Sequence, residues 1–253
     1  MRVVLTRPAA EGARWSADLA RHGHQALLLP LIDIGPAPDA QALGAARERL
    51  AAYQAVMFVS ANAVRQFTGS AQELAWPGAT QAWATGPGTA QALREAGVPG
   101  AQIVAPADDA ARFDSEALWD RAAAAVQPGW RVLVVRGAGA DGAPAGRDWL
   151  TVRLQDAGAG VDQVAAYARR LPHWSDAQRA AAERAASDGS VWLFSSSEAV
   201  ANLCRLLPAQ DWSGARALAT HERIAQAARE AGFVVDCVRP GLGALLRTLE
   251  SSR

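Results

Sequence analysis

Lysine is absent from this sequence of 253 residues, so all 25 of its basic side chains are arginines. No lysine is therefore available to form a Schiff base, to anchor pyridoxal phosphate or to bind phosphates in a P-loop. The planar guanidinium group of arginine instead suits bidentate hydrogen bonding to a carboxylate or a phosphate.

Cysteine and histidine are also scarce, with two and four residues. The two cysteines, Cys204 and Cys237, are isolated and predict neither a disulfide framework nor a zinc site. The histidines have no metal-ligand spacing such as HExxH. We therefore expect no metal and no cofactor.

Neither sign of charge is in excess, because 25 acidic residues balance the 25 basic ones. A nucleic-acid-binding surface needs a basic face, so we expect no nucleic-acid partner. No apolar run approaches the length of a membrane span, and the first residues, MRVVLTRPAAEG, predict a strand rather than a signal peptide. We expect no membrane contact and a cytoplasmic location.

What the chain does contain is an internal repeat. Residues 82–98 and 217–233 are identical at ten of 17 positions, at an offset of 135 residues. The segments that begin at Arg2 and Arg131 are also similar, at an offset of 129, and the difference of six residues falls in the Gly/Ala-rich stretch 137–146. Two copies of this size are too few and too large for a solenoid. The repeat predicts a duplicated domain with a cleft between its copies.

Short apolar strands alternate with amphipathic helices in each copy, which predicts an α/β fold with parallel sheets covered on both faces. We expect one helix over 88–97 that Gly97 closes, and another over 115–126 that Ser115 caps. Pro30 marks its strand as an edge strand or an irregular one. The expected strands are 3–6, 26–34, 56–60, 82–85, 102–106, 131–135, 191–195, 217–220 and 234–238.

Candidate binding residues follow the strands, because ligands of open α/β sheets bind beyond the carboxyl ends of the strands. The turn from Thr85 to Thr89 offers hydroxyls and backbone N–H groups at a helix start, which suits an anion as well as a purely structural turn. The serines after two strands suit helix capping as well as binding. Two arginines that close matched strands would suit a polyanion. The candidates are Arg7, Ser60, Asn62, Thr85, Gly86, Gly88, Thr89, Arg136, Gly137, Ser195, Ser196 and Thr220.

Two further features concern catalysis. The glycine pattern GAGADG at 137–142 follows a strand, but no helix opens directly from it, so hydride transfer is not predicted. The chain has two tyrosines, Tyr53 and Tyr167. Tyr53 precedes a buried strand and is expected to be structural. Tyr167 lies in an extended run, where its phenol would serve either in packing or as a proton donor.

Several segments together resemble the uroporphyrinogen-III synthase family, over residues 3 to about 248. They are VLTRP (4–8), FVSANAV (58–64) with FSSSEAV (194–200), ATGPGTAQAL (84–93), RVLVVRG (131–137), GRDWL (146–150) and AAYARR (165–170). The chain departs from the family pattern in two places. Gly137 and Arg147 are separated by an insertion, and Thr220 lacks the glycine that often follows it.

The resemblance implies two similar Rossmann/flavodoxin-like domains that are interleaved. One domain would comprise residues 1–34 and 171–253, and the other residues 38–166. Residues 30–38 and 163–172 would form a two-stranded antiparallel connector, which suits a mobile hinge.

The resemblance also implies the chemistry. Family members close hydroxymethylbilane, a linear tetrapyrrole with eight carboxylates, to uroporphyrinogen III with inversion of ring D and loss of water, without a cofactor. Tyr167 matches the family's tyrosine and would assist departure of the hydroxyl group. We expect a monomer, with transient contact with hydroxymethylbilane synthase.

Two other functions stay open from the residues alone. The first is a two-domain α/β enzyme that acts on a phosphorylated metabolite through the 85–89 turn. The second is a hinged protein that binds a polyanion without chemistry.

Overall fold

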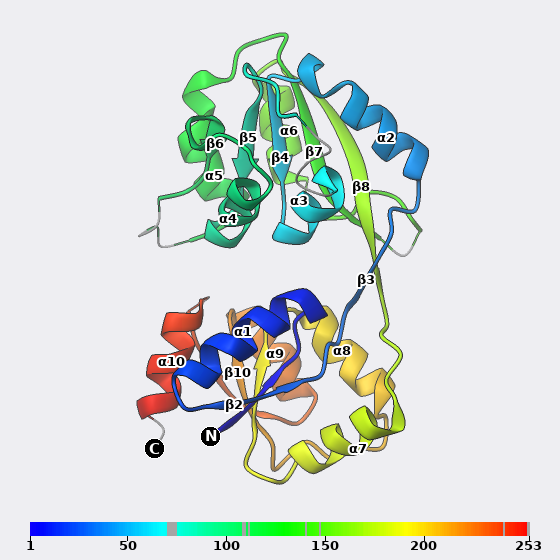
Figure 1. Ribbon diagram of the computed structural model, residues 1–253, viewed down its shortest axis with the longest axis vertical. Helices are drawn as coiled ribbons and strands as arrows, with labels where there is room; N and C mark the ends of the chain where they lie inside the picture. Colours follow the sequence, from blue (N-terminus) through cyan, green and yellow to red (C-terminus); the bar gives the residue numbers. More distant parts are fainter. Residues whose placement is uncertain are drawn as a thin grey trace. The chain divides into compact units, whose positions relative to one another are not determined.

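The computed structural model describes residues 1–69, 75–107, 110, 112–139, 141–146, 148–239 and 241–251 (Figure 1). Its contacts divide the chain into two compact units. Unit 1 comprises Met1–Asp33 and Arg170–Arg253, and unit 2 comprises Ile34–Arg169. Among the described residues, no helix combines the length and the apolar character needed to cross a bilayer.

Unit 1 is built on a five-stranded sheet with the order β11-β10-β9-β1-β2. All four of its strand pairs are parallel, and the two strands from the start of the chain lie beside strands from near its end. The strands are β1 (Arg2–Leu5), β2 (Gln25–Leu28), β9 (Val191–Phe194), β10 (Arg216–Ala219) and β11 (Val234–Cys237), and the helices are α1 (Ala9–Arg21), α7 (Asp176–Ala185), α8 (Ser197–Leu206), α9 (Glu222–Glu230) and α10 (Leu242–Ser251).

Alternating residues of β9 show how unit 1 buries both faces of its sheet. Val191 and Leu193 join the apolar cluster under α1 and α10, two helices that Figure 1 shows together on one face. Trp192 and Phe194 point to the opposite face, as the two-residue period of a strand requires. There they pack with Trp212 and Phe233 in an aromatic cluster whose ring centroids are 5.0–6.1 Å apart.

Unit 2 is built on a six-stranded sheet with the order β3-β8-β7-β4-β5-β6. Apolar residues of α2, α3 and α4 cover one face together with Tyr167, and those of α5 and α6 cover the other. The strands are β3 (Asp33–Gly35), β4 (Ala55–Phe58), β5 (Gln81–Ala84), β6 (Ile103–Val104), β7 (Arg131–Ala138) and β8 (Gly160–Arg170). The helices are α2 (Ala40–Glu48), α3 (Ala61–Thr68), α4 (Pro87–Glu95), α5 (Ser115–Ala122) and α6 (Trp149–Asp156), with single 3₁₀ turns η1 (Leu50–Ala52), η2 (Gly100–Gln102) and η3 (Ala123–Ala125).

The predicted α/β class with two interleaved parallel-sheet units is thus confirmed, but three elements differ from expectation. The strand expected over 102–106 is reduced to the two residues of β6, and Gln102 belongs to the turn η2. The strand expected over 26–34 is divided into β2 and β3, which belong to different sheets. It breaks around Pro30, which has no N–H to donate. The carbonyl oxygens of Pro30 and Leu31 instead accept hydrogen bonds from Trp174 Nε1 (2.9 Å) and Asn202 Nδ2 (2.8 Å).

The helix expected over 115–126 is shorter, since α5 ends at Ala122 and continues as the 3₁₀ turn η3. Its cap is Asp114 rather than Ser115, because the Asp114 carboxylate accepts the hydrogen bond from the N–H of Ala117 at 2.9 Å. Gly97, with φ of 83°, closes α4 as predicted, since glycine adopts this conformation without a steric penalty.

Candidate active site

Three residues from three neighbouring strands of unit 2 meet at the carboxyl ends of those strands. Ser60 follows β4, Gly137 lies near the end of β7, and Tyr167 lies near the end of β8. Ser60 Oγ and Tyr167 Oη are 3.2 Å apart and form a hydrogen bond, although the residues are 107 positions apart in the chain. This is where the fold places the candidate proton donor of the sequence.

The contact spans two strand spacings, because β7 lies between β4 and β8. Neighbouring strands are about 4.8 Å apart, so the two backbones are separated by about 9.5 Å. The side chains of Ser60 and Tyr167 meet across this gap because the residue between them, Gly137, has no side chain. A Cβ on Gly137 would lie 2.8 Å from Cζ and 3.1 Å from Oη of Tyr167.

A β-bulge brings Tyr167 to this position. Arg136 pairs with Ala165, but the next residue of β7, Gly137, pairs with Tyr167, so β8 has one extra residue between the two pairs. Such a bulge redirects the side chains that follow it. Tyr167 therefore lies on the face covered by α2, α3 and α4, and only 4% of its surface is exposed.

Ser60 is also the N-cap of α3. Its Oγ accepts a hydrogen bond from the N–H of Ala63 at 3.1 Å, which confirms the capping prediction for this serine. Asn62 lies in the first turn of the same helix, and its Oδ1 accepts a hydrogen bond from Arg65 Nη1 at 3.4 Å.

The turn from Thr85 to Thr89 lies after the next strand of the sheet, β5. Thr85 donates its hydroxyl proton to the carbonyl of Val59 at 3.2 Å, which ties the ends of β5 and β4 together. Gly86 is the N-cap of α4 and approaches the side chain of Phe113, whereas a Cβ on Gly88 would meet no atom within 4 Å. Thr89 is buried. Pro87 and Gly88 are thus the exposed residues of this turn.

Both candidate arginines interact with carboxylates of the same chain. Arg136 is 3% exposed and donates from Nη1 to Asp148 at 3.2 Å. Arg7 donates from Nη1 to Glu11 at 3.1 Å, and its guanidinium lies 4.3 Å from the ring centre of Trp15. Arg147 lies outside the described residues. Arg7 and Arg136 are therefore each paired with a carboxylate of the same chain.

The corresponding positions of unit 1 differ from those of unit 2. Ser195 and Ser196 follow β9, and Ser196 is the N-cap of α8 but makes no side-chain capping bond, unlike Ser60. Thr220 follows β10, where its N–H donates to the carbonyl of Phe194 at 3.1 Å. At the offset of the repeat, Ile32 corresponds to Tyr167, so unit 1 has no phenol at this position.

The comparisons with known proteins identify the family of this chain. Residues 13–246 match the family model described as Uroporphyrinogen-III synthase HemD. The chain belongs to the uroporphyrinogen-III synthase family. A uroporphyrinogen-III synthase of Synechococcus elongatus is 30% identical over 217 residues, which cover 83% of this chain and 77% of the relative.

Two solved structures share the fold with this member of the uroporphyrinogen-III synthase family. A uroporphyrinogen-III synthetase of Helicobacter pylori aligns over 100% of this chain and 99% of its own, with a TM-score of 0.64 and 15% identity. A mutant uroporphyrinogen III synthase of Thermus thermophilus aligns over 100% and 98%, with a TM-score of 0.53 and 20% identity.

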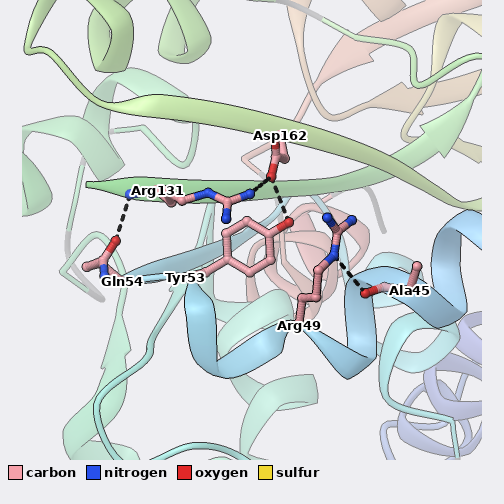
Figure 2. A network of polar contacts seen from close by, with 6 residues as sticks. All are labelled: Ala45, Arg49, Tyr53, Gln54, Arg131 and Asp162. Carbon is pink, nitrogen blue, oxygen red and sulfur yellow. Dashed lines mark hydrogen bonds and ion pairs between the residues drawn. The ribbon is translucent and has the colours of Figure 1, made fainter. Parts of the chain in front are cut away.

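A second polar network of this uroporphyrinogen-III synthase family member lies at the other end of the unit 2 sheet, where β7 and β8 begin (Figure 2). Asp162 accepts hydrogen bonds from Tyr53 Oη (2.8 Å) and Arg131 Nη2 (2.7 Å). The bond from Tyr53, aided by Arg131, holds the pKa of the Asp162 carboxyl below its ordinary value. Burial, followed by the bond to Asp162, raises the pKa of Tyr53. Tyr53 thus lies in the buried core of unit 2 with its hydroxyl group bound to Asp162.

Sequence reasoning missed the carboxylates that pair with the two arginines. Glu11 follows Arg7 by four residues at the start of α1, and this spacing is a recognisable signal for an ion pair on a helix. Asp148 has no such signal, because it follows the insertion of this chain and reaches Arg136 through the fold. Among the described residues, no group of three or more His, Cys, Asp or Glu side chains could hold a metal ion.

Proposed function

We propose that this protein closes hydroxymethylbilane to uroporphyrinogen III, with inversion of ring D and loss of water, and that Tyr167 is its catalytic residue. The match to the family model over residues 13–246 is the observation that supports this activity. The position of the Tyr167 phenol at the carboxyl ends of the unit 2 strands, beside the helix-capping Ser60, supports the role of this residue.

In the proposed first step, the phenol of Tyr167 acts as a general acid. Its proton passes to the hydroxyl oxygen of the substrate's hydroxymethyl group, the C–O bond breaks with both electrons going to oxygen, and water leaves. The substituted α-carbon of ring D then attacks the methylene carbon of the resulting azafulvene, which gives a spiro-pyrrolenine. The bond between this carbon of ring D and the bridge carbon to ring C then breaks. The unsubstituted α-carbon of ring D bonds to that bridge carbon instead, which inverts the ring, and the proton lost from this α-carbon restores the phenol.

The remaining work is to hold a flexible polyanion in the bent form that reacts. Well-oriented intramolecular attack has effective molarities up to about 10⁵–10⁸ M, so positioning supplies much of the acceleration. Since Arg7 and Arg136 already face Glu11 and Asp148, we assign carboxylate binding chiefly to backbone N–H groups at helix starts. The starts of α3 and α4, with Asn62 and Gly88, are the candidates in unit 2.

The other candidate residues complete this proposal. In unit 1, Ser195, Ser196 and Thr220 would contact the substrate carboxylates beyond β9 and β10. We further propose a cytoplasmic monomer that receives the bilane by transient contact with hydroxymethylbilane synthase. Such a transfer would limit closure of the free bilane without inversion.

A coupled assay tests this function. Hydroxymethylbilane synthase supplies the bilane, and the isomers formed with and without the protein are separated by chromatography after oxidation to porphyrins. We expect isomer III in its presence and isomer I in its absence. Isomer I alone in both samples contradicts the proposal. In that event, protection from unfolding by sugar phosphates would favour an enzyme of phosphorylated metabolites, and binding of bilane without conversion would favour a polyanion-binding protein.

A further inference from the structure

The hydroxyl group of Ser60 takes part in two hydrogen bonds at once. Its Oγ accepts the N–H of Ala63 at 3.1 Å, and it lies 3.2 Å from Oη of Tyr167. A serine hydroxyl has one proton to donate and two lone pairs to accept with. The bond from the Ala63 N–H uses one lone pair and leaves the hydroxyl proton and the second lone pair, so either oxygen can be the donor in the bond between Ser60 and Tyr167.

The direction of this chain of bonds matters for proton donation. The first-turn N–H groups of α3 form the positive end of the helix dipole. An N–H that donates to Ser60 Oγ strengthens the Ser60 hydroxyl as a donor, because bonds in a chain polarise one another. If Ser60 donates to Tyr167 Oη, the phenolic proton must point elsewhere, and the negative charge that develops on Oη is stabilised.

We propose that Ser60 is a positioning residue, which donates a hydrogen bond to the phenol oxygen of Tyr167 and so directs the phenolic proton toward the hydroxyl group of the substrate. This inference rests on the proposed function. It differs from substrate binding by Ser60, because Ser60 here acts through Tyr167.

Comparison of the two units supports a specific pairing of Ser60 with Tyr167. In unit 2 the serine that follows β4 both caps its helix and reaches the phenol, across a glycine that leaves the space open. In unit 1, Ser195 matches Ser60 in the repeat, Pro8 matches Gly137 and Ile32 matches Tyr167. The N-cap serine of that helix, Ser196, makes no side-chain capping bond. Ser60 therefore makes both a capping bond and a contact with the phenol, whereas Ser196 makes no capping bond.

A matched pair of variants separates this role from helix capping. Asparagine and aspartate have the same shape and both are good N-caps, but only the asparagine amide can donate a hydrogen bond. Ser60→Asn therefore keeps the cap and a donor, whereas Ser60→Asp keeps the cap and offers Tyr167 only an acceptor. Ser175→Ala is the control, because Ser175 caps α7 in unit 1, where no phenol is present.

The expected kinetic result is a fall in kcat of about 10- to 100-fold for Ser60→Asp relative to Ser60→Asn, the range for a hydrogen bond to a group that becomes charged. KM should differ by less than about threefold between the two, and Ser175→Ala should keep the wild-type kcat. Equal kcat values for the Asn and Asp variants would mean that Ser60 is only a cap, and a change confined to KM would mean that it only binds substrate.

A spectroscopic measurement tests the hydrogen bond without the reaction. The chain has two tyrosines, so labelling of tyrosine Cζ with ¹³C gives two resonances, and Tyr53→Phe assigns them. In Ser60→Asp the Tyr167 resonance should move toward the phenolate position, because the phenol then donates to a carboxylate, whereas in Ser60→Asn it should not. Identical spectra in the two variants overturn the proposal. Failure of the wild type to make isomer III, with this spectral difference intact, would refute the proposed function alone.

Discussion

Replacement of Gly137 by alanine should displace the phenol of Tyr167 without removing it. The new Cβ would lie 2.8 Å from Cζ and 2.9 Å from Cε2 of the ring, and ordinary contact begins at 3.4 Å. The ring would therefore have to retreat by roughly 0.6 Å, the difference between the two distances. Gly137 lies within β7, where alanine is acceptable to the backbone, so the effect comes from the contact alone.

The ring has little room for this retreat, because Tyr167 is 4% exposed and packed in the core under α2, α3 and α4. Overpacking of a core by one methyl group costs about 1–3 kcal/mol of stability. A displacement approaching 1 Å in a catalytic geometry can cost about 10²-fold in rate. We expect Gly137→Ala to lower both the melting temperature and the rate of isomer III formation, the latter by about 10- to 100-fold.

The assay combines thermal unfolding with the coupled isomer assay, and it has two controls. Gly44→Ala in α2 meets no atom within 4 Å and should stabilise the protein by about 0.5–1 kcal/mol with an unchanged rate. The double variant Gly137→Ala/Tyr167→Phe should be no slower than Tyr167→Phe alone, since both changes act on one phenol. A wild-type rate in Gly137→Ala, or additive losses in the double variant, would refute this reasoning.

Three further predictions concern other parts of the chain. Tyr167→Phe should lower turnover by about 10²-fold or more with little change in melting temperature, and a wild-type rate would reduce Tyr167 to a packing residue. Asp162→Asn should flatten the acid side of the stability–pH curve. The pKa of Asp162 is lower in the folded state, chiefly because of the hydrogen bond from Tyr53. The stabilisation of the folded state by Asp162 is therefore present above the unfolded pKa of about 3.9 and is lost as the pH falls through the folded pKa. An unchanged stability at acid pH in Asp162→Asn would contradict this. Arg47→Ala should lower the free energy of unfolding in urea by about 1–3 kcal/mol, because Arg47 donates to the carbonyls of Gln66 and Phe67 at the end of α3. A decrease below about 0.5 kcal/mol, the size of an ordinary surface change, would show that these hydrogen bonds are dispensable.

Local features of the site could be predicted from the sequence, whereas its contacts could not. A serine before a helical pattern predicts an N-cap, because its hydroxyl group satisfies a free N–H, and Ser60 does cap α3. The matched positions of Arg7 and Arg136 predict anion ligands, and this role stays a prediction; their ion pairs with Glu11 and Asp148 could not be read from the sequence of the strands. The pattern of a strand predicts the position of an arginine in the sheet, but it does not predict which carboxylate the side chain contacts.

The amino-acid sequence alone determined the absence of lysine chemistry, the α/β alternation and the duplication, because these depend on composition and on short periodicities. The interleaving, in which β1 and β2 complete a sheet formed by β9, β10 and β11, was implied by the family resemblance and not by any periodicity, and the tertiary structure decided the strand order within it. It also decided the meeting of Ser60 with Tyr167, which depends on the β7–β8 bulge and on the missing side chain of Gly137. Strand order and register are set by pairing between distant segments, and no local pattern in the chain records which partner each strand takes.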